Sequence, residues 1–181
     1  MKTRITIVIL FLFISGTLLL PRMVSFERKI AIEAPQEVVF NQVNDLCSWG
    51  KWSGLTPNCP ADEVNYLNAG PGCLAGYSWE TSAQTRKVVV TAAAPCDSVL
   101  VVMDFMRHSH ATTCFRFTEE NGTTTVIWQM EADLGNNPLS RLSGLFFNHL
   151  LGPDLERGLK KLKKMTEAEA VHRQQIAGRQ N

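Results

Sequence analysis

The polar residues whose types could support chemistry are few and scattered along the chain. His108 and His110 flank Ser109, so in an extended strand both imidazoles would lie on one face and could bind a metal ion. A metal site would need a third ligand, and no neighbouring cluster of His, Cys, Asp or Glu supplies one. We therefore predict an exposed loop at this position and no metal ligands.

Three further polar residues are candidates for a place inside a cavity. They are Glu80, Gln129 and His149, although ordinary surface hydrogen bonding is the simpler explanation for each. The chain contains no local nucleophile–base signature, no Gly-x-Ser-x-Gly motif, no phosphate-binding glycine loop and no paired-carboxylate motif. The sequence therefore predicts no catalytic residue and no cofactor.

The cysteines do not form a metal-binding pattern either. Five of them, at positions 47, 59, 73, 96 and 114, are too dispersed for a zinc site, and their odd number leaves at least one thiol unpaired within the chain. One bridge, between Cys59 and Cys73, could form if the domain lies outside the cytosol.

The first residues of the chain have the composition of a membrane anchor. A basic start with Lys2 and Arg4 is followed by residues 5–20, which carry no charge. We see no Ala-x-Ala cleavage site after this run and no cysteine near it for lipid attachment, which favours an uncleaved anchor over residues 1–24. The basic start then predicts a single-pass protein with its domain on the extracytoplasmic side. The alternative is a signal peptide whose cleavage releases a secreted protein.

The segments after the anchor have the periodicities of strands and short helices. Residues 26–33 alternate apolar and polar side chains, which predicts a strand with one buried face. Pro35 opens a predicted helix, and a second short helix or turn contains Trp49 and Trp52. Six further strand-like segments cover residues 63–68, 74–80, 85–92, 98–106, 111–119 and 123–132. The turn-like breaks between them, such as Asn121-Gly122, predict an antiparallel meander.

A long amphipathic helix ends the predicted domain. Asn137-Pro138 is typical of a helix cap and first helical position. Gly152-Pro153 should kink or restart the helix, because proline removes a backbone donor. The last helical stretch has an apolar face formed by Leu155, Leu159, Leu162 and Met165. Residues 168–181 are polar, and we expect this tail to fray.

The order of these elements predicts an α+β fold, because the helices do not alternate with the strands. Hydrophobic residues make up 45% and charged residues 19% of the 181 residues, which suits one globular domain, predicted over residues 25–167. The net charge of +1 gives no support for a nucleic-acid partner.

A series of short pieces in a characteristic order resembles a known superfamily. The pieces are residues 34–40 after the first strand, Trp49-x-x-Trp52-Ser53, Gly70-x-Gly72 with Trp79, residues 124–130 and residues 152–159. In order and spacing they resemble the START-like superfamily, also called SRPBCC or the polyketide cyclase/dehydrase group. The resemblance implies a helix-grip fold, in which a curved antiparallel sheet of about seven strands wraps around a long C-terminal helix. It also implies an apolar cavity between sheet and helix. Members bind lipids, sterols, quinones, hormones or polyketides, and a minority are enzymes.

Alternation along the strands places one set of large apolar side chains on the inner face of the sheet. Together with two tryptophans that would rim the mouth and with residues of the last helix, they form the predicted ligand wall: Trp49, Trp52, Tyr77, Trp79, Met103, Phe105, Phe115, Phe117, Trp128, Met130, Leu155, Gly158, Leu159 and Leu162. Plain core packing is the competing explanation for each of them. The tryptophan pair could instead anchor the short helix to the sheet, and Gly158 could instead allow close packing against an aromatic ring such as Trp128.

Four lysines of the last helix lie off its apolar stripe, at positions 160, 161, 163 and 164. A solvated helix face is the simpler explanation for them, and contact with anionic lipid headgroups is the alternative.

These observations predict a non-enzymatic protein that binds, transports or senses a hydrophobic small molecule or lipid at a membrane. The alternatives are a polyketide cyclase- or aromatase-like enzyme, and an interaction module whose outer sheet face binds a protein partner that the sequence does not name.

Overall fold

The predicted helix-grip fold is confirmed by the computed structural model, which describes residue 16 and residues 19–54, 64–68, 71–80, 85–106 and 109–179. A seven-stranded antiparallel sheet has the strand order β1-β7-β6-β5-β4-β3-β2. Its strands are β1 (Met23–Ile32), β2 (Val64–Leu67), β3 (Gly76–Glu80), β4 (Thr85–Ala94), β5 (Ser98–Met106), β6 (Ser109–Glu120) and β7 (Thr123–Asp133). The chain crosses from β1 at one edge to β2 at the other through α2 (Gln36–Asn44), a 3-10 turn (Leu46–Ser48) and α3 (Trp49–Trp52).

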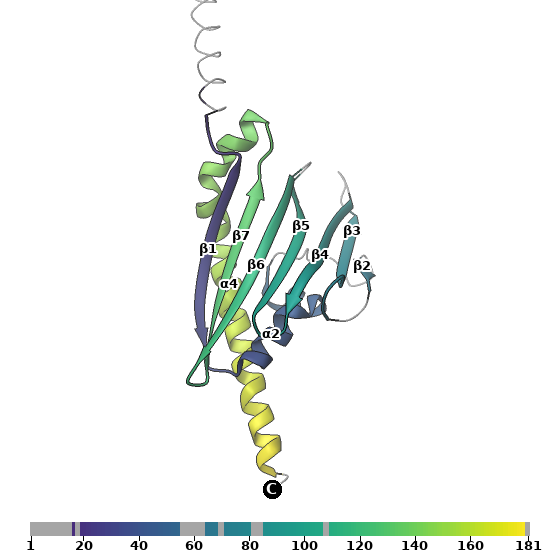
Figure 1. Cartoon of the computed structure of the whole chain (residues 1–181), viewed down its shortest axis with the longest axis vertical. Coiled ribbons are helices and arrows are strands. Elements are labelled where there is room, and N and C mark those ends of the chain that lie inside the picture. The colour runs from purple at the N-terminus through teal and green to yellow at the C-terminus, as the bar shows by residue number, and fades with distance from the viewer. Residues whose placement is uncertain are drawn as a thin grey trace, which may run out of the picture.

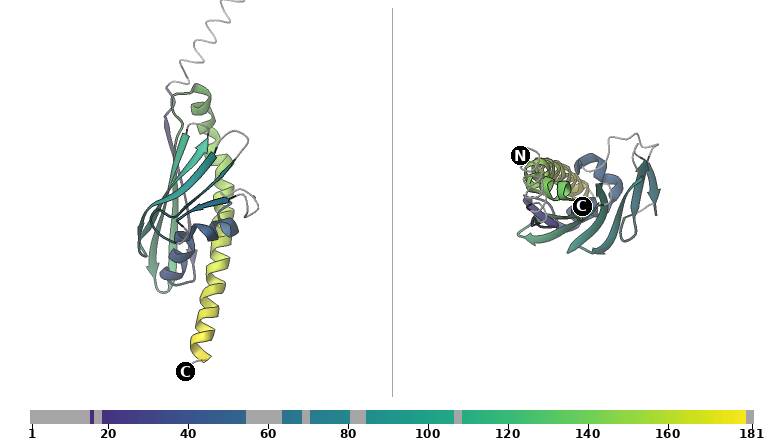
Figure 2. Two further views of the ribbon diagram at one scale, coloured as in Figure 1. Left: turned by 90° about the vertical axis from the view of Figure 1, so that its right-hand side faces the viewer. Right: turned by 90° about the horizontal axis from the view of Figure 1, so that it is seen from above.

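The sheet curves around the helices, and the longest helix, α4 (Pro138–Arg179), runs along its concave side (Figures 1 and 2). Register shifts between Val90 and Ala92, and between Asp104 and Met106, interrupt the pairing of β4 with β5 and of β5 with β6. Irregularities of this kind bend strands, which helps a sheet to wrap around a helix. The Asn121-Gly122 turn between β6 and β7 takes positive φ at both residues, as the predicted hairpin requires.

The alternation predicted for the inner face is confirmed by burial. On β7, Val126, Trp128 and Met130 are fully buried, and the matching positions of β6 and β5 are buried as well. Gln129, by contrast, lies on the outer face. Leu155, Leu159 and Leu162 of α4 are buried against this inner layer, so the apolar stripe of the helix packs on the sheet as its periodicity predicts.

Helix α4 differs from its prediction at two places. It is one helix of 42 residues with Pro153 inside it, so it does not restart at Gly152-Pro153. The side chain of Arg28 from β1 ties the turns on either side: its Nη2 donates to Asn148 Oδ1 at 2.8 Å and its Nε donates to Glu156 Oε1 at 2.9 Å. Gly152 is buried beneath this guanidinium, in space that a Cβ atom would enter.

The second difference is the C-terminal tail, which is helical up to Arg179 rather than frayed. Its last turns project beyond the sheet (Figure 1). Residues 171–179 are all exposed, which agrees with their polar character.

Two predictions concern residues that the structure leaves undescribed. Most of the anchor predicted for residues 1–24 lies outside the described residues. The same holds for one half of the predicted disulfide, because Cys59 falls in the undescribed segment 55–63. Among the helices that are described, none has both the length and the apolarity needed to cross a bilayer.

Candidate ligand-binding site

Four aromatic side chains meet between α3, the sheet and α4. Trp49, Trp52, Phe115 and Trp128 are each fully buried. The Trp52 ring lies 5.4 Å from Trp49, 5.9 Å from Phe115 and 5.7 Å from Trp128, centroid to centroid, in tilted or edge-to-face arrangements. The two tryptophans of α3 share a face because they lie three residues apart, and they fix this short helix to the sheet. The positions of Trp49 and Trp52 therefore show that they anchor α3 to the sheet.

The three indole N–H groups of this cluster differ in their partners. Trp49 Nε1 donates to Val43 O at 2.7 Å, and Trp128 Nε1 donates to Thr113 Oγ1 at 2.6 Å. Trp52 Nε1 is buried and has no hydrogen-bond partner among the described residues; the same is true of Asn44 Oδ1. An unpaired buried donor costs roughly 1–3 kcal/mol, so this N–H is a strong candidate to bind an acceptor.

Gly158 brings α4 unusually close to this cluster. A Cβ atom there would lie 3.0 Å from Ser53 O, 3.1 Å from a ring carbon of Trp128 and 3.2 Å from Trp52 O. Two of these neighbours are backbone atoms and the third belongs to a fully buried ring, so none can move away easily. The glycine is thus explained by close packing against Trp128 and the end of α3.

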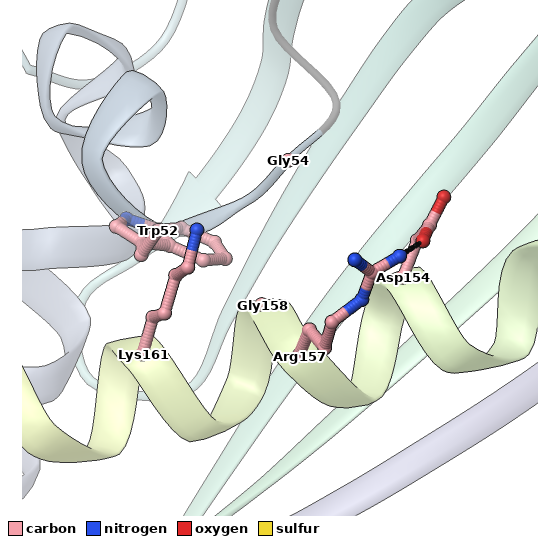
Figure 3. Close-up of a pocket in the computed structure, with 6 residues that line it drawn as sticks. All are labelled: Trp52, Gly54, Asp154, Arg157, Gly158 and Lys161. Carbon is pink, nitrogen blue, oxygen red and sulfur yellow. Dashed lines mark hydrogen bonds and ion pairs between the residues drawn. The ribbon is translucent and has the colours of Figure 1, made fainter.

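A pocket of about 190 Å³ opens beside Gly158 and Trp52. It is lined by Trp52, Gly54, Asp154, Arg157, Gly158 and Lys161 (Figure 3). Lys161 reaches from α4 towards Trp52, while Arg157 turns towards Asp154, with which it forms an ion pair. Pockets that hold a whole drug-sized ligand measure roughly 300–1,000 Å³, so this space suits only a part of a ligand. Its charged lining residues are Asp154, Arg157 and Lys161.

The residues of the predicted ligand wall are thus brought to one side of the sheet, but only some of them reach this pocket. Trp52 and Gly158 line it. The other predicted residues whose side chains are described lie in the buried layer between sheet and helices: Trp49, Tyr77, Met103, Phe115, Phe117, Trp128, Met130, Leu155, Leu159 and Leu162. Trp79 and Phe105 belong to β3 and β5, and their side chains are outside the description. Contact between this set and a ligand stays a prediction.

Gly54, Asp154, Arg157 and Lys161 were not among the predicted site residues. Asp154 and Lys161 lie four and three residues from Gly158, and this helical spacing is the signal by which the sequence could have identified them. Arg157 is adjacent to Gly158 in sequence. Gly54 has a positive φ of 68° at the end of α3, a position that favours glycine and that sequence alone does not reveal.

The polar candidates for the cavity do not gather there. Gln129 lies on the outer face, where Arg116 Nη2 donates to its Oε1 at 2.6 Å and its Nε2 donates to Glu131 Oε1 at 3.0 Å. His149 is exposed on α4, and the Glu80 side chain is not described. Gln129 and His149 are therefore surface residues.

The structure describes only one residue of the histidine pair, His110. His110 is exposed and its Nδ1 lies 2.9 Å from Asp104 Oδ1, while His108 is outside the described residues. Within the described part of the chain there is no group of three or more His, Cys, Asp or Glu side chains placed to hold a metal ion.

Tyr77 is a buried titratable group of the inner face. Burial raises the pKa of its hydroxyl well above the usual range, with a smaller contribution from Tyr66, so the hydroxyl stays neutral. The two tyrosine rings lie 6.4 Å apart. Tyr77 is therefore suited to hydrogen bonding and not to acting as a base.

A family model described as polyketide cyclase / dehydrase and lipid transport matches residues 23–167. A search of curated proteins gave no match.

Solved structures with similar folds come from proteins of different kinds. The di-domain ARO/CYC StfQ from the steffimycin biosynthetic pathway aligns with a TM-score of 0.60 and 13% identity, over 82% of this chain and 52% of that one. SA2116 from Staphylococcus aureus, a protein of unknown function, aligns with a TM-score of 0.60 and 10% identity, over 81% of this chain and 95% of that one. Ara h 8.0201 aligns with a TM-score of 0.53 and 11% identity, over 83% of this chain and 99% of that one. At these identities the likeness shows the fold alone, and this chain spans about half the length of StfQ.

Proposed function

The chain belongs to the polyketide cyclase/dehydrase and lipid transport family, and from this premise we propose that it binds a hydrophobic small molecule or lipid between α4 and the sheet. In this proposal the protein does not transform the ligand, and its N-terminal segment tethers it to a membrane. The family description and the fold support binding of an apolar molecule. The uncharged run of residues 5–20 supports the tether.

The observation that carries the proposal is the buried indole N–H of Trp52 in the aromatic cluster, which has no hydrogen-bond partner among the described residues. The ligand supplies the acceptor, a carbonyl or hydroxyl oxygen, and lays its apolar part against neighbouring rings. Such a molecule gains about 25 cal/mol for each Å² of apolar surface that it buries, so burial of about 300 Å² contributes roughly 7–8 kcal/mol before the costs of association. The Trp52 hydrogen bond then sets its orientation.

The second candidate is a cyclase- or aromatase-like enzyme, which the family description and the fold of StfQ also allow at a coarse level. That activity needs a proton donor or acceptor beside the ligand. Of the three predicted candidates, Gln129 and His149 do not supply it, because both lie on the surface, and the side chain of Glu80 is not described. We therefore place binding before catalysis.

The interaction module is the third alternative. The outer face of the sheet has a shallow hollow of about 220 Å³ lined by Leu100, Thr112, Cys114, Arg116, Gln129 and Glu131. Its lining mixes apolar with charged side chains, whereas a docking patch for a protein has a largely apolar centre. This hollow gives the alternative little support.

Native mass spectrometry of the full chain, released from membranes in mild detergent, tests the proposal. We expect a bound apolar mass with the wild-type protein and about tenfold weaker retention with Trp52→Phe, because one hydrogen bond of roughly 1.5 kcal/mol is lost. Trp49→Phe is the matched control, since its N–H is already satisfied by Val43 O. It should retain the ligand while losing stability. A wild-type protein without a bound mass, or equal retention by both variants, contradicts the proposal.

A further inference from the structure

Helix α4 has a second organised side, directed away from the sheet. Residues spaced three or four apart form this side, which we call the outer face of α4. Its first half is apolar and consists of Leu139, Leu142, Phe146 and Leu150. Its second half is basic and consists of Arg157, Lys160, Lys161 and Lys164.

Three of the four side chains of the apolar half are exposed, and Leu142 is half-buried. Leu139, Phe146 and Leu150 are 68%, 57% and 61% exposed, whereas Phe147 is buried against the sheet. Three large apolar side chains in a row on one exposed face are more than the scattered apolar residues of an ordinary surface. The composition of this half is therefore typical of a surface that is covered by a membrane or by another apolar surface.

The basic half carries a net positive charge. Its three lysines are exposed, and the carboxylates of nearby turns are occupied elsewhere: Glu156 binds Arg28 and Glu167 binds Lys163. Asp154 compensates Arg157 alone. Lys160 and Lys164 thus lie exposed on the outer face, Lys161 lies at its margin beside the pocket, and no ion pair with a described carboxylate is formed by any of the three.

Lys163 belongs to a different side of the helix. Its Nζ donates to Ala31 O of β1 at 2.8 Å. The structure therefore divides the lysine run into three exposed residues, one of which also lines the pocket, and one that ties α4 to the sheet.

Leu20, the last residue of the uncharged N-terminal run, lies beside the first turns of the same helix. The run ends at Leu20, and β1 begins at Met23, at the end of the sheet where α4 starts (Figure 1). Arg141, between Leu139 and Leu142, donates from Nη1 to Leu20 O at 3.4 Å. If the proposed tether holds residues 5–20 in a bilayer, its end at Leu20 brings that bilayer near the first turns of α4.

From this arrangement we infer that the outer face of α4 lies on an anionic bilayer surface. Its leucines and phenylalanine enter the boundary between headgroups and acyl chains, and its lysines contact acidic headgroups, which is how amphipathic helices bind membranes. Arg157 and Lys161 also line the pocket beside Trp52, so docking places the pocket mouth at the lipid surface. The inference deepens the proposed function and rests on it for the tether and the ligand.

The test measures lysine accessibility in the full chain held in lipid nanodiscs. An amine-acetylating reagent is applied to discs of phosphatidylcholine alone and to discs with about one third phosphatidylglycerol, and mass spectrometry gives the rate at each lysine. We expect Lys160, Lys161 and Lys164 to be protected several-fold on the anionic discs. Raised salt should remove this protection by screening. Lys87, exposed on β4, should react equally in both.

Paired variants separate the outer face from the rest of the helix. Lys160→Gln should lower the protection of Lys164 about fivefold, the effect of one basic residue near an anionic surface. Lys163→Gln removes the same charge from the side of α4 that faces β1, and it should leave the protection of Lys164 unchanged. Phe146→Ser should abolish the protection, because the loss of apolar burial weakens membrane contact about tenfold. Leu145→Ser should not, because Leu145 is 59% exposed but lies off this face.

Equal acetylation on both kinds of disc overturns the inference. Protection that ignores lipid charge and grows with the number of chains per disc also overturns it, since it indicates a second copy of the chain on this face. Either result leaves the proposed ligand intact, because the bound mass in native mass spectrometry does not depend on headgroup charge.

Discussion

At the scale of single residues, Gly158 shows how one missing side chain sets the distance between two elements. Glycine inside a helix costs about 1 kcal/mol relative to alanine, yet here it allows α4 to approach Ser53 O and the ring of Trp128. The same close approach puts Trp52 and α4 on opposite sides of the pocket mouth. At Gly158, close packing at the site therefore outweighs the loss of helix propensity.

Gly158→Ala should destabilise the protein. Overpacking costs about 2 kcal/mol and the gain in helix propensity offsets about 1, so we expect a net loss of about 1 kcal/mol in the free energy of unfolding. Urea denaturation of the full chain in mild detergent measures it. Gly178→Ala is the control, because a Cβ there meets nothing within 4 Å and should be neutral or slightly stabilising. Equal effects of the two substitutions would show that the close contacts at Gly158 are easily relieved.

At the scale of elements, an ion pair joins the start of β1 to the end of β7. Arg22 donates from Nε and Nη2 to both carboxylate oxygens of Asp133, at 2.7 and 2.6 Å, and Gly135 N donates to the same carboxylate at 2.8 Å. These contacts lower the pKa of Asp133 to about 2, with the Arg22 hydrogen bond as the main cause. The pair lies where the N-terminal segment meets the sheet.

The stabilisation from Asp133 should depend on pH. The folded-state pKa lies below the ordinary 3.8, so the contribution is complete above that value and is lost as the pH falls towards 2. Thermal unfolding of the wild type and of Asp133→Asn, followed by circular dichroism from pH 6 to pH 2, should show Tm values that differ at pH 6 and converge at pH 2. A constant difference across this range would mean that Asp133 acts through shape and not through its charge.

At the scale of the whole molecule, α4 is longer than the sheet it covers. Thr166 and Ala170 are its last buried residues, and every later described residue is exposed. Contacts near this point, such as Gln42 Nε2 donating to Glu169 Oε2 at 2.8 Å, mark where the packed domain ends. The projecting turns contribute little buried surface.

Deletion of residues 171–181 should therefore change the free energy of unfolding by less than about 0.5 kcal/mol, as surface changes usually do. A chain ending at Lys164 loses the buried Thr166 and Ala170 and should be destabilised by about 2 kcal/mol or more. Denaturant unfolding of both truncated chains measures the contrast. A large loss with the shorter deletion would mean that the projecting turns pack against something in the intact protein.

The sequence by itself determined the elements and their inner faces. Alternation identified Trp128 and Met130 as inward residues, and the spacing of Leu155, Leu159 and Leu162 identified the buried stripe of α4, because both periods are properties of the local backbone. The predicted antiparallel order followed from short turns such as Asn121-Gly122 for the same reason. The family resemblance then supplied the helix-grip arrangement that local patterns do not define.

Tertiary structure decided what local patterns leave open. The continuity of α4 through Pro153 depends on Arg28, which comes from β1 and is remote in sequence. The unpaired state of the Trp52 N–H, beside two tryptophans whose N–H groups are satisfied, depends on which carbonyl or hydroxyl the fold brings near each indole. The separation of Lys163 from Lys160, Lys161 and Lys164 depends on how α4 is rotated against β1. Contacts between distant segments form only when the chain closes on itself, so sequence periodicity carries no record of them.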